Sequence, residues 1–182
     1  MHGLKFTHME NNNNPDIYNL YSIYDVSNEI HETAIIYDSV VMGKNNKIGA
    51  YSVIGSNGEI RNCKSFNGIV EIGNGNIISE LVTIQRPSVK GSITKIGNDN
   101  IIMAHAHIGH DAQIGDNCEI STGSIIGGYT IIEDGVKIKL GCTIRNRRKV
   151  SKDAVIGMGA VVVKDVPEKE IWVGNPAKKI VK

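Results

Sequence analysis

Residues 96–162 read IGNDNIIMAHAHIGHDAQIGDNCEISTGSIIGGYTIIEDGVKIKLGCTIRNRRKVSKDAVIGMGAVV. Every sixth residue of this stretch, from Ile96 to Val162, is isoleucine or valine. The same phase runs back to Ile30, and Lys90 is its only polar member. A period of six fits neither the period of a helix, about 3.6, nor the plain alternation of a single strand. It is typical of short repeats that wind into a parallel β-helix.

The other positions of the six-residue repeat agree with this fold. Glycine often follows the aliphatic residue, as at Gly97 and Gly109, and suits a position where the backbone must turn a corner without a side-chain clash. The residue two before the aliphatic is usually small, as at Ala106. One large and one small inward side chain per repeat would fill a narrow triangular prism. With three repeats per coil, the 23 repeats from Ile30 to Val162 predict between seven and eight coils.

The pattern divides the chain into three parts. Residues 1–29 form a short N-terminal segment that we expect to be partly disordered, because it holds the run Asn11–Asn14. Residues 30–166 form the β-helix, with a loop near 86–95 where the core position falls on Lys90. Residues 167–182 form a cap over the last coil. The 182 residues therefore make a single all-β domain.

Composition restricts the function classes. The chain has 20 Lys and Arg against 19 Asp and Glu, a net charge of +1, which predicts no nucleic-acid partner. No apolar run is long enough for membrane insertion, and no signal peptide precedes the repeats, so we expect a cytoplasmic protein. Cys118 and Cys142 fall on the small inward position and are interpreted as core residues, not as metal ligands or disulfide partners.

Three of the six histidines lie within a few residues of one another, at His105, His107 and His110. The repeat phase places them at outward or corner positions, on the outside of the prism. A flat β-helix face forms a cleft where two subunits meet, and such proteins usually close as three-fold rings. At such a seam the histidines could be general bases, metal ligands or ordinary interface hydrogen-bonding groups.

Two neighbours favour the general base. Asp111 follows His110 directly, and a carboxylate beside an imidazole can fix its tautomer and stabilise the imidazolium. Asp111 could equally be a turn residue at the corner. Gly128 stands 18 residues after His110, one coil further on, where its N–H could meet a substrate oxyanion. It could also be a plain corner glycine.

The repeats, together with the motifs at 156–162 and 173–177, resemble the hexapeptide-repeat acyltransferases. The resemblance implies a left-handed β-helix and a homotrimer that uses acyl-CoA or an acyl-carrier protein. Residues 82–86 and 101–111 are more similar to the UDP-N-acetylglucosamine O-acyltransferases of lipid A synthesis. The spacing from histidine and acid to glycine is also that of the N-acetyltransferases of nucleotide-linked amino sugars.

The resemblance implies roles for individual residues. It makes His110 the catalytic base, Asp111 its supporting acid and Gly128 the oxyanion donor. The remaining assignments are substrate-binding positions, at His105, His107, Gln85, Arg86 and Tyr129, and contacts to the acyl donor, at Gly141, Gly159, Ala160, Lys164 and Lys178. No metal and no permanently bound cofactor are expected.

This sequence departs from the lipid A enzymes in three respects. Tyr129 stands where they have a histidine, Arg145-Asn146 where they have His-Gln, and their C-terminal helical domain does not follow. We therefore predict an N-acyltransferase that moves an acetyl or short hydroxyacyl group from acyl-CoA to the amine of a nucleotide-linked amino sugar in surface glycan synthesis.

Three alternatives stay open. The first is a carrier-protein-dependent sugar O-acyltransferase of the lipid A type. The second is a γ-type carbonic anhydrase, although Asp111-Ala112-Gln113 follows His110 where that family has a further ligand histidine. The third is a non-catalytic β-helix subunit.

Overall fold

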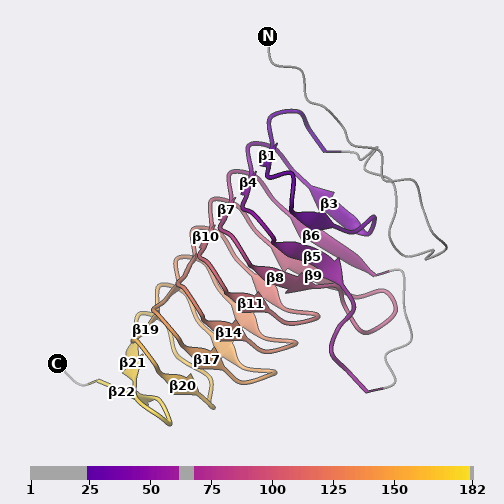
Figure 1. The fold of residues 1–182 in the computed structure, drawn as a ribbon. Helices are drawn as coiled ribbons and strands as arrows, with labels where there is room; N and C mark the ends of the chain where they lie inside the picture. The colour runs from indigo at the N-terminus through magenta and orange to yellow at the C-terminus, as the bar shows by residue number, and fades with distance from the viewer. Residues whose placement is uncertain (1–23, 62–67, 181–182) are drawn as a thin grey trace.

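The computed structural model describes residues 24–61 and 68–180. They form a parallel β-helix of three flat sheets, seen as a regular staircase of coils in Figure 1. The expected disorder of the N-terminal segment falls mainly on residues 1–23, which lie outside the described part. No helix in the described part is long and apolar enough to cross a membrane.

Each coil contributes one strand to each sheet. Sheet A contains β1 (Glu29–Ile30), β4 (Lys47–Ile48), β7 (Ile77–Ile78), β10 (Ile101–Ile102), β13 (Glu119–Ile120), β16 (Lys137–Ile138), β19 (Val155–Ile156), β21 (Ile171–Val173) and β22 (Lys178–Lys179). Sheet B contains β2 (Ile35–Ile36), β5 (Val53–Ser56), β8 (Thr83–Gln85), β11 (His107–Ile108), β14 (Ile125–Ile126), β17 (Thr143–Ile144) and β20 (Val161–Val162). Sheet C contains β3 (Val40–Met42), β6 (Ile69–Ile72), β9 (Ile93–Ile96), β12 (Gln113–Ile114), β15 (Ile131–Ile132) and β18 (Lys149–Val150).

The strand register reveals two excursions from the coil. Ile108 pairs with Ile126, the expected 18 residues on, but Ile54 pairs with Ile84 and Ile84 with Ile108. The chain therefore leaves the coil twice between a strand of sheet B and the next strand of sheet C. The first excursion follows β5 and is described at residues 57–61 and 68, and the second comprises residues 86–92. Because the extra lengths are multiples of six, they preserve the repeat phase, and only the polar residue at the core position, Lys90, marked the second excursion in the sequence.

This finding corrects the predicted number of coils. Ile60, counted as a core position, lies in the first excursion and is 38% exposed. Phe66 lies outside the described residues, and Lys90 is an exposed residue of the second excursion. The twenty strands β1–β20 make between six and seven coils, not between seven and eight.

The predicted inward positions are confirmed. Isoleucines at the sixth positions from Ile72 to Ile156 are at most 2% exposed, and Cys118 and Cys142 fill small inward positions as expected. Burial raises the pKa of the Cys118 thiol to about 11, so this sulfur stays protonated.

A ladder of asparagines shares this interior and was not predicted. The side-chain amide of Asn100 donates to Asn76 Oδ1 at 3.0 Å, and that of Asn76 donates to Asn46 Oδ1 at 2.9 Å. All three asparagines are fully buried. Their amide groups satisfy one another from coil to coil, which removes the cost of burying them unpaired.

The glycines that follow the aliphatic residue avoid a side-chain clash, as predicted. A Cβ on Gly109, whose φ is not positive, would lie 2.7 Å from the Gly128 nitrogen of the next coil, whereas Gly55 also has a positive φ, of 92°. Glycine is needed at position 109 because successive coils approach closely. The left-handed residue of each corner comes two positions later, as at Asp111 (φ 60°) and Tyr129 (φ 58°).

The described part of the C-terminal segment closes the end of the helix. Strand β21 adds to sheet A in parallel with β19, pairing Trp172 with Ile156, and β22 folds back antiparallel to β21. Trp172 packs partly buried against the core. The hairpin of β21 and β22 thus extends sheet A beyond the last coil.

Candidate active site

The chain has three kinds of corner, and one of them collects the predicted catalytic residues. The BC corner, as we call the turn from a sheet B strand to the next sheet C strand, comprises residues 109–112, 127–130 and 145–148 in three successive coils. Both excursions leave the helix at this same corner, the first after β5 and the second after β8. In Figure 1 the described parts of both protrude on one side of the staircase. The BC corner is therefore the only irregular edge among the described coils.

His110 and Asp111 form a buried pair at the BC corner. His110 Nδ1 lies 2.8 Å from Asp111 Oδ2, and the two residues are 8% and 6% exposed. Asp111 occupies the left-handed position of the corner, a conformation that aspartate tolerates better than most residues. The predicted base and supporting acid are thus brought together, although the excursions cover them more than an outward position implies.

The Asp111 carboxylate is surrounded by donors from the second excursion. Oδ2 accepts the Ser88 N–H at 2.9 Å and the Ser88 hydroxyl at 2.7 Å, and Oδ1 accepts the Ser92 hydroxyl. Burial by itself raises the pKa of Asp111, but these bonds and the one from His110 outweigh burial and hold the pKa below its ordinary value. Asp111 is an anion at neutral pH.

An anionic Asp111 fixes the tautomer of His110. The carboxylate accepts the proton on Nδ1, so Nε2 of the neutral imidazole carries the lone pair. Nε2 faces the next coil, because a Cβ on Gly128 would lie 2.6 Å from it. The basic nitrogen is thus directed at the Gly128 backbone.

The Gly128 N–H is suited to bind an oxyanion. It donates to none of the residues that the structure describes, whereas the neighbouring Gly127 and Tyr129 amides donate to Ile144 and His110 carbonyls at 2.9 Å. An N–H that no carbonyl takes up, next to a basic imidazole, can stabilise negative charge on a reacting carbonyl oxygen.

Tyr129 and Arg147 line the same corner one and two coils below His110. The Tyr129 ring meets the His110 ring edge to face, with centroids 5.0 Å apart and an interplanar angle of 85°. The Arg147 guanidinium lies over the Tyr129 ring, 4.0 Å from its centroid. The aromatic side chain therefore stands between a cation and the proposed base.

Gln85 and Arg86, predicted to bind substrate, are both buried at the base of the second excursion. Gln85 Oε1 accepts the His110 N–H at 3.3 Å, and Arg86 Nε donates to Asn57 Oδ1 of the first excursion at 2.7 Å. The first excursion also touches the base directly, since a Cβ on Gly58 would lie 2.9 Å from His110 Cβ. Both residues thus pack the described stem of the excursions against the corner.

The other two histidines lie apart from this pair. His107 is on the outer face of β11, half-buried, with Nδ1 2.8 Å from Thr83 Oγ1; burial lowers its pKa, partly offset by Glu59. His105 precedes β11, exposed at the corner between sheets A and B. Among the described residues, no three His, Cys, Asp or Glu side chains are grouped as metal ligands.

The predicted contacts to the acyl donor do not converge within one chain. Gly141 and Gly159 lie at the corner between sheets A and B, where their N–H groups already donate to Thr122 and Leu140 carbonyls. Lys164 and Lys178 are exposed on two other edges.

Ala160 lies in the core at the same corner as Gly159. It is fully buried, its N–H donates to Gly157 O at 3.2 Å, and its carbonyl accepts the Thr143 N–H at 2.9 Å. Its contact to the acyl donor stays a prediction.

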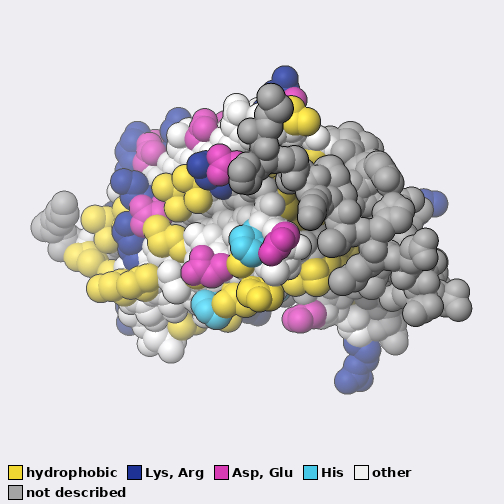
Figure 2. Space-filling model, turned by 45° about the horizontal axis from the view of Figure 1, so that its top comes forward, with side chains coloured by type: hydrophobic (Ala, Val, Ile, Leu, Met, Phe, Trp, Pro, Cys, Tyr) yellow, Lys and Arg dark blue, Asp and Glu magenta, His cyan; other side chains and the backbone are white. Residues whose placement is uncertain are grey.

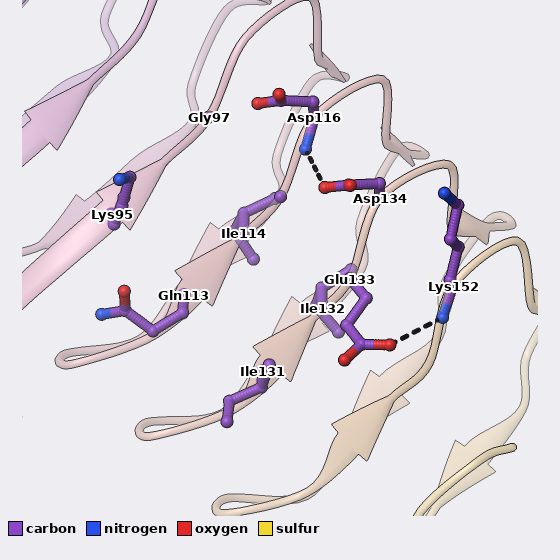
Figure 3. Close-up of a pocket in the computed structure, with 11 residues that line it drawn as sticks. Lys95, Gly97, Gln113, Ile114, Asp116, Ile131, Ile132, Glu133, Asp134 and Lys152 are labelled. Carbon is purple, nitrogen blue, oxygen red and sulfur yellow. Dashed lines mark hydrogen bonds between the residues drawn. The ribbon is translucent and has the colours of Figure 1, made fainter. Parts of the chain in front are cut away.

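A depression of about 550 Å³ lies elsewhere, on the outer face of sheet C, and holds none of the residues just described. Figure 3 shows Lys95, Gln113 and Ile131 on its strands and Glu133 beside the Lys152 backbone. Glu133 is paired with Lys149 at 2.6 Å and Lys95 with Glu71 at 3.5 Å. We assign it no chemistry.

The sequence reasoning missed Ser88, Ser92 and Thr94. Thr94 Oγ1 accepts the Asp111 N–H at 2.8 Å, so Ser88, Ser92 and Thr94 all contact Asp111. The only sequence signal was the missed core position at Lys90, which marked the loop but not its target.

Comparisons with known proteins agree with this geometry. Residues 93–128 match the family model for the bacterial transferase hexapeptide (six repeats). The chain is 31% identical over 137 residues to the acyl-[acyl-carrier-protein]–UDP-N-acetylglucosamine O-acyltransferase of a Synechocystis species, covering 75% of this chain and 50% of the relative. It spans about half the length of the curated relatives it matches.

Solved structures give the same result. The UDP-N-acetylglucosamine acyltransferase of Bacteroides fragilis superposes with a TM-score of 0.82 at 30% identity, covering 85% of this chain and 60% of that one. The Francisella novicida enzyme gives 0.68 at 30% identity, covering 85% and 68%. The predicted left-handed β-helix and the resemblance to hexapeptide-repeat transferases are confirmed.

Proposed function

We propose an acyltransferase function for this chain, which belongs to the bacterial hexapeptide-repeat transferases and among them is similar to the UDP-N-acetylglucosamine O-acyltransferases. The acceptor is a hydroxyl of a UDP-linked N-acetylamino sugar, and the donor is an acyl thioester on a carrier protein. The observation that carries the proposal is the His110–Asp111 pair, whose free imidazole nitrogen faces the Gly128 backbone.

The chemistry follows from this arrangement. His110 Nε2 takes the proton from the acceptor hydroxyl as its oxygen attacks the thioester carbonyl. Asp111 keeps the Nδ1 proton in place and stabilises the imidazolium that forms. The Gly128 N–H donates to the oxyanion of the tetrahedral intermediate. When the intermediate collapses, the imidazolium returns its proton to the departing thiolate of the donor.

The oxygen acceptor replaces the amine that we predicted from sequence alone. The curated relatives that the chain matches are O-acyltransferases with a carrier-protein donor. This supports a carrier-protein-dependent sugar O-acyltransferase over an N-acyltransferase that uses acyl-CoA. The chemistry agrees, because a hydroxyl needs proton removal to become a good nucleophile, whereas a neutral amine already is one.

The active unit is a homotrimer in the cytoplasm, where carrier proteins and nucleotide sugars are available. Sheet C exposes Ile69, Ile93 and Ile131 beside charged residues such as Lys95 and Lys149. On sheets A and B, isoleucines stand exposed at 42–50%. They are Ile35, Ile77, Ile101 and Ile125. Figure 2 shows such hydrophobic side chains in bands beside two histidines. A second copy of the chain over this apolar surface would close a cleft along the His107 side of the BC corner.

A substrate matrix tests this proposal. The purified chain is given one acyl group on acyl-carrier protein or on CoA, with UDP-N-acetylglucosamine or its analogue bearing an amine at the acylated position. We expect product from the carrier-bound donor and the hydroxyl acceptor, with the CoA donor at least about 10-fold slower in kcat/KM. Preference for CoA and the amine would restore the N-acyltransferase, and inactivity with all four combinations would refute the proposal.

A further inference from the structure

We propose that Ser88, Ser92 and Tyr129 form one hydrogen-bonded support that holds the Asp111 carboxylate in line behind His110, and that Tyr129 is a positioning residue, not a contact to the substrate. This inference rests on the proposed function. It assigns a role to the second excursion, and it changes the role that the sequence implied for Tyr129.

The first step concerns how Asp111 is held. Its side chain is only 3% exposed, so removing any one of its hydrogen-bond donors would leave part of a buried negative charge unpaired. Ser88 supplies two of the donors, its N–H and its hydroxyl. The Ser92 hydroxyl, which also lies 2.7 Å from the Val89 carbonyl, supplies a third on the other oxygen, because a carboxylate is the stronger acceptor of its single proton. With His110 as the fourth, both carboxylate oxygens are held and the group cannot rotate away from the imidazole without breaking several bonds.

The second step fixes the direction of the Tyr129 bond. The Ser88 and Tyr129 hydroxyl oxygens lie 2.8 Å apart, and either could donate in isolation. The single Ser88 hydroxyl proton, however, points to Asp111 Oδ2. Tyr129 must therefore donate to Ser88. Its proton is committed to the support, so the phenol is not available to donate to a substrate or to act as an acid.

The third step concerns the Tyr129 ring. It is held on one side by the Arg147 guanidinium at 4.0 Å and meets the His110 ring edge to face on the other. Its backbone N–H also donates to the His110 carbonyl at 2.9 Å. The ring thus limits rotation of the imidazole while its hydroxyl braces Ser88. Contacts at the BC corner thus connect four successive turns of the chain, from the second excursion through His110 and Tyr129 to Arg147.

Three hydroxyl deletions test the inference: Ser88→Ala, Ser92→Ala and Tyr129→Phe. A misaligned base slows the chemical step without weakening substrate binding, so we expect each to lower kcat by about 5- to 50-fold with KM for both substrates within about two-fold of wild type. Ser88→Thr and Ser92→Thr, which keep a hydroxyl, should recover much of the rate. Thermal unfolding of each variant shows whether the chain is still folded.

The outcomes separate the two proposals. If Tyr129 contacted the sugar directly, Tyr129→Phe would raise KM for the UDP-sugar and leave kcat unchanged, which would overturn the inference. Wild-type kcat in all three folded alanine and phenylalanine variants would overturn it as well, provided that the wild type is active and His110→Ala is not. Inactivity of the wild type with every donor and acceptor contradicts the proposed function itself.

Discussion

Gly128→Ala is the sharpest test of the reaction centre. The new methyl group would lie 2.5 Å from His110 Cε1 and 2.6 Å from Nε2, where ordinary contact begins at 3.4 Å. The groups must therefore separate by about 0.8–0.9 Å. The backbone on either side is held by the Tyr129 N–H to His110 O and the Arg147 N–H to Gly128 O bonds, at 2.9 and 3.0 Å. The imidazole is the part that moves.

A displacement of about 1 Å at the base can cost about 10²-fold in rate, and we expect kcat of Gly128→Ala to fall by about that factor or more. The overpacking itself should cost about 1–3 kcal/mol of stability. Positive φ is not involved at this glycine, so the loss is steric. Acyl transfer under saturating substrates and chemical denaturation measure the two effects separately.

Gly115→Ala is the matched control. Its methyl group would meet Asp134 Oδ1 at 2.4 Å and Asp134 N at 2.8 Å, a comparable clash at the corner between sheets C and A. It should lose similar stability and keep kcat. The reasoning fails if Gly128→Ala turns over like the wild type, or if Gly115→Ala loses as much kcat as Gly128→Ala.

Four further predictions follow from the same structure. His110→Ala should lower kcat by about 10²-fold or more, while His31→Ala, at an exposed histidine of the first coil, should not. Equal kcat in the two variants would mean that the His110–Asp111 pair has a structural role only. Because the folded-state pKa of Asp111 is depressed, its ionisation stabilises the fold above a pH of about 4 and this contribution disappears as the pH falls through the folded pKa. Urea unfolding should therefore show a weaker loss of stability below about pH 4 for Asp111→Asn than for the wild type, and parallel curves would contradict this. Light scattering should give a molar mass three times the 19.8 kDa of one chain. Ile125→Lys, at a 46% exposed position, should lower the measured mass toward that of a single chain. An active monomeric wild type would refute the trimer. Activity should survive dialysis against a chelator, whereas stoichiometric zinc lost together with activity would favour the metal alternative.

The site was only partly accessible from the sequence. His110, Asp111 and Gly128 could be placed at one corner because adjacency and an 18-residue stacking distance follow directly from the repeat. Ser88 and Ser92 could not, since their bonds to Asp111 span 23 and 19 residues, and no repeat relates an excursion to the coil below it. His105, His107 and His110 all fall on outward or corner positions of the repeat, yet only His110 lies at the corner where the excursions fold over.

The sequence by itself determined the parallel β-helix, its core and the outward face of the histidines, because these depend on a local period that every coil repeats. Only the tertiary structure decided which repeats stack on which, because excursions of 6 and 12 extra residues leave the phase of Ile54, Ile84 and Ile108 unchanged. It likewise decided that Asp111 is buried and ionised. That state depends on donors brought from another coil, and a contact between coils is set by their stacking in space, which a one-dimensional period does not contain.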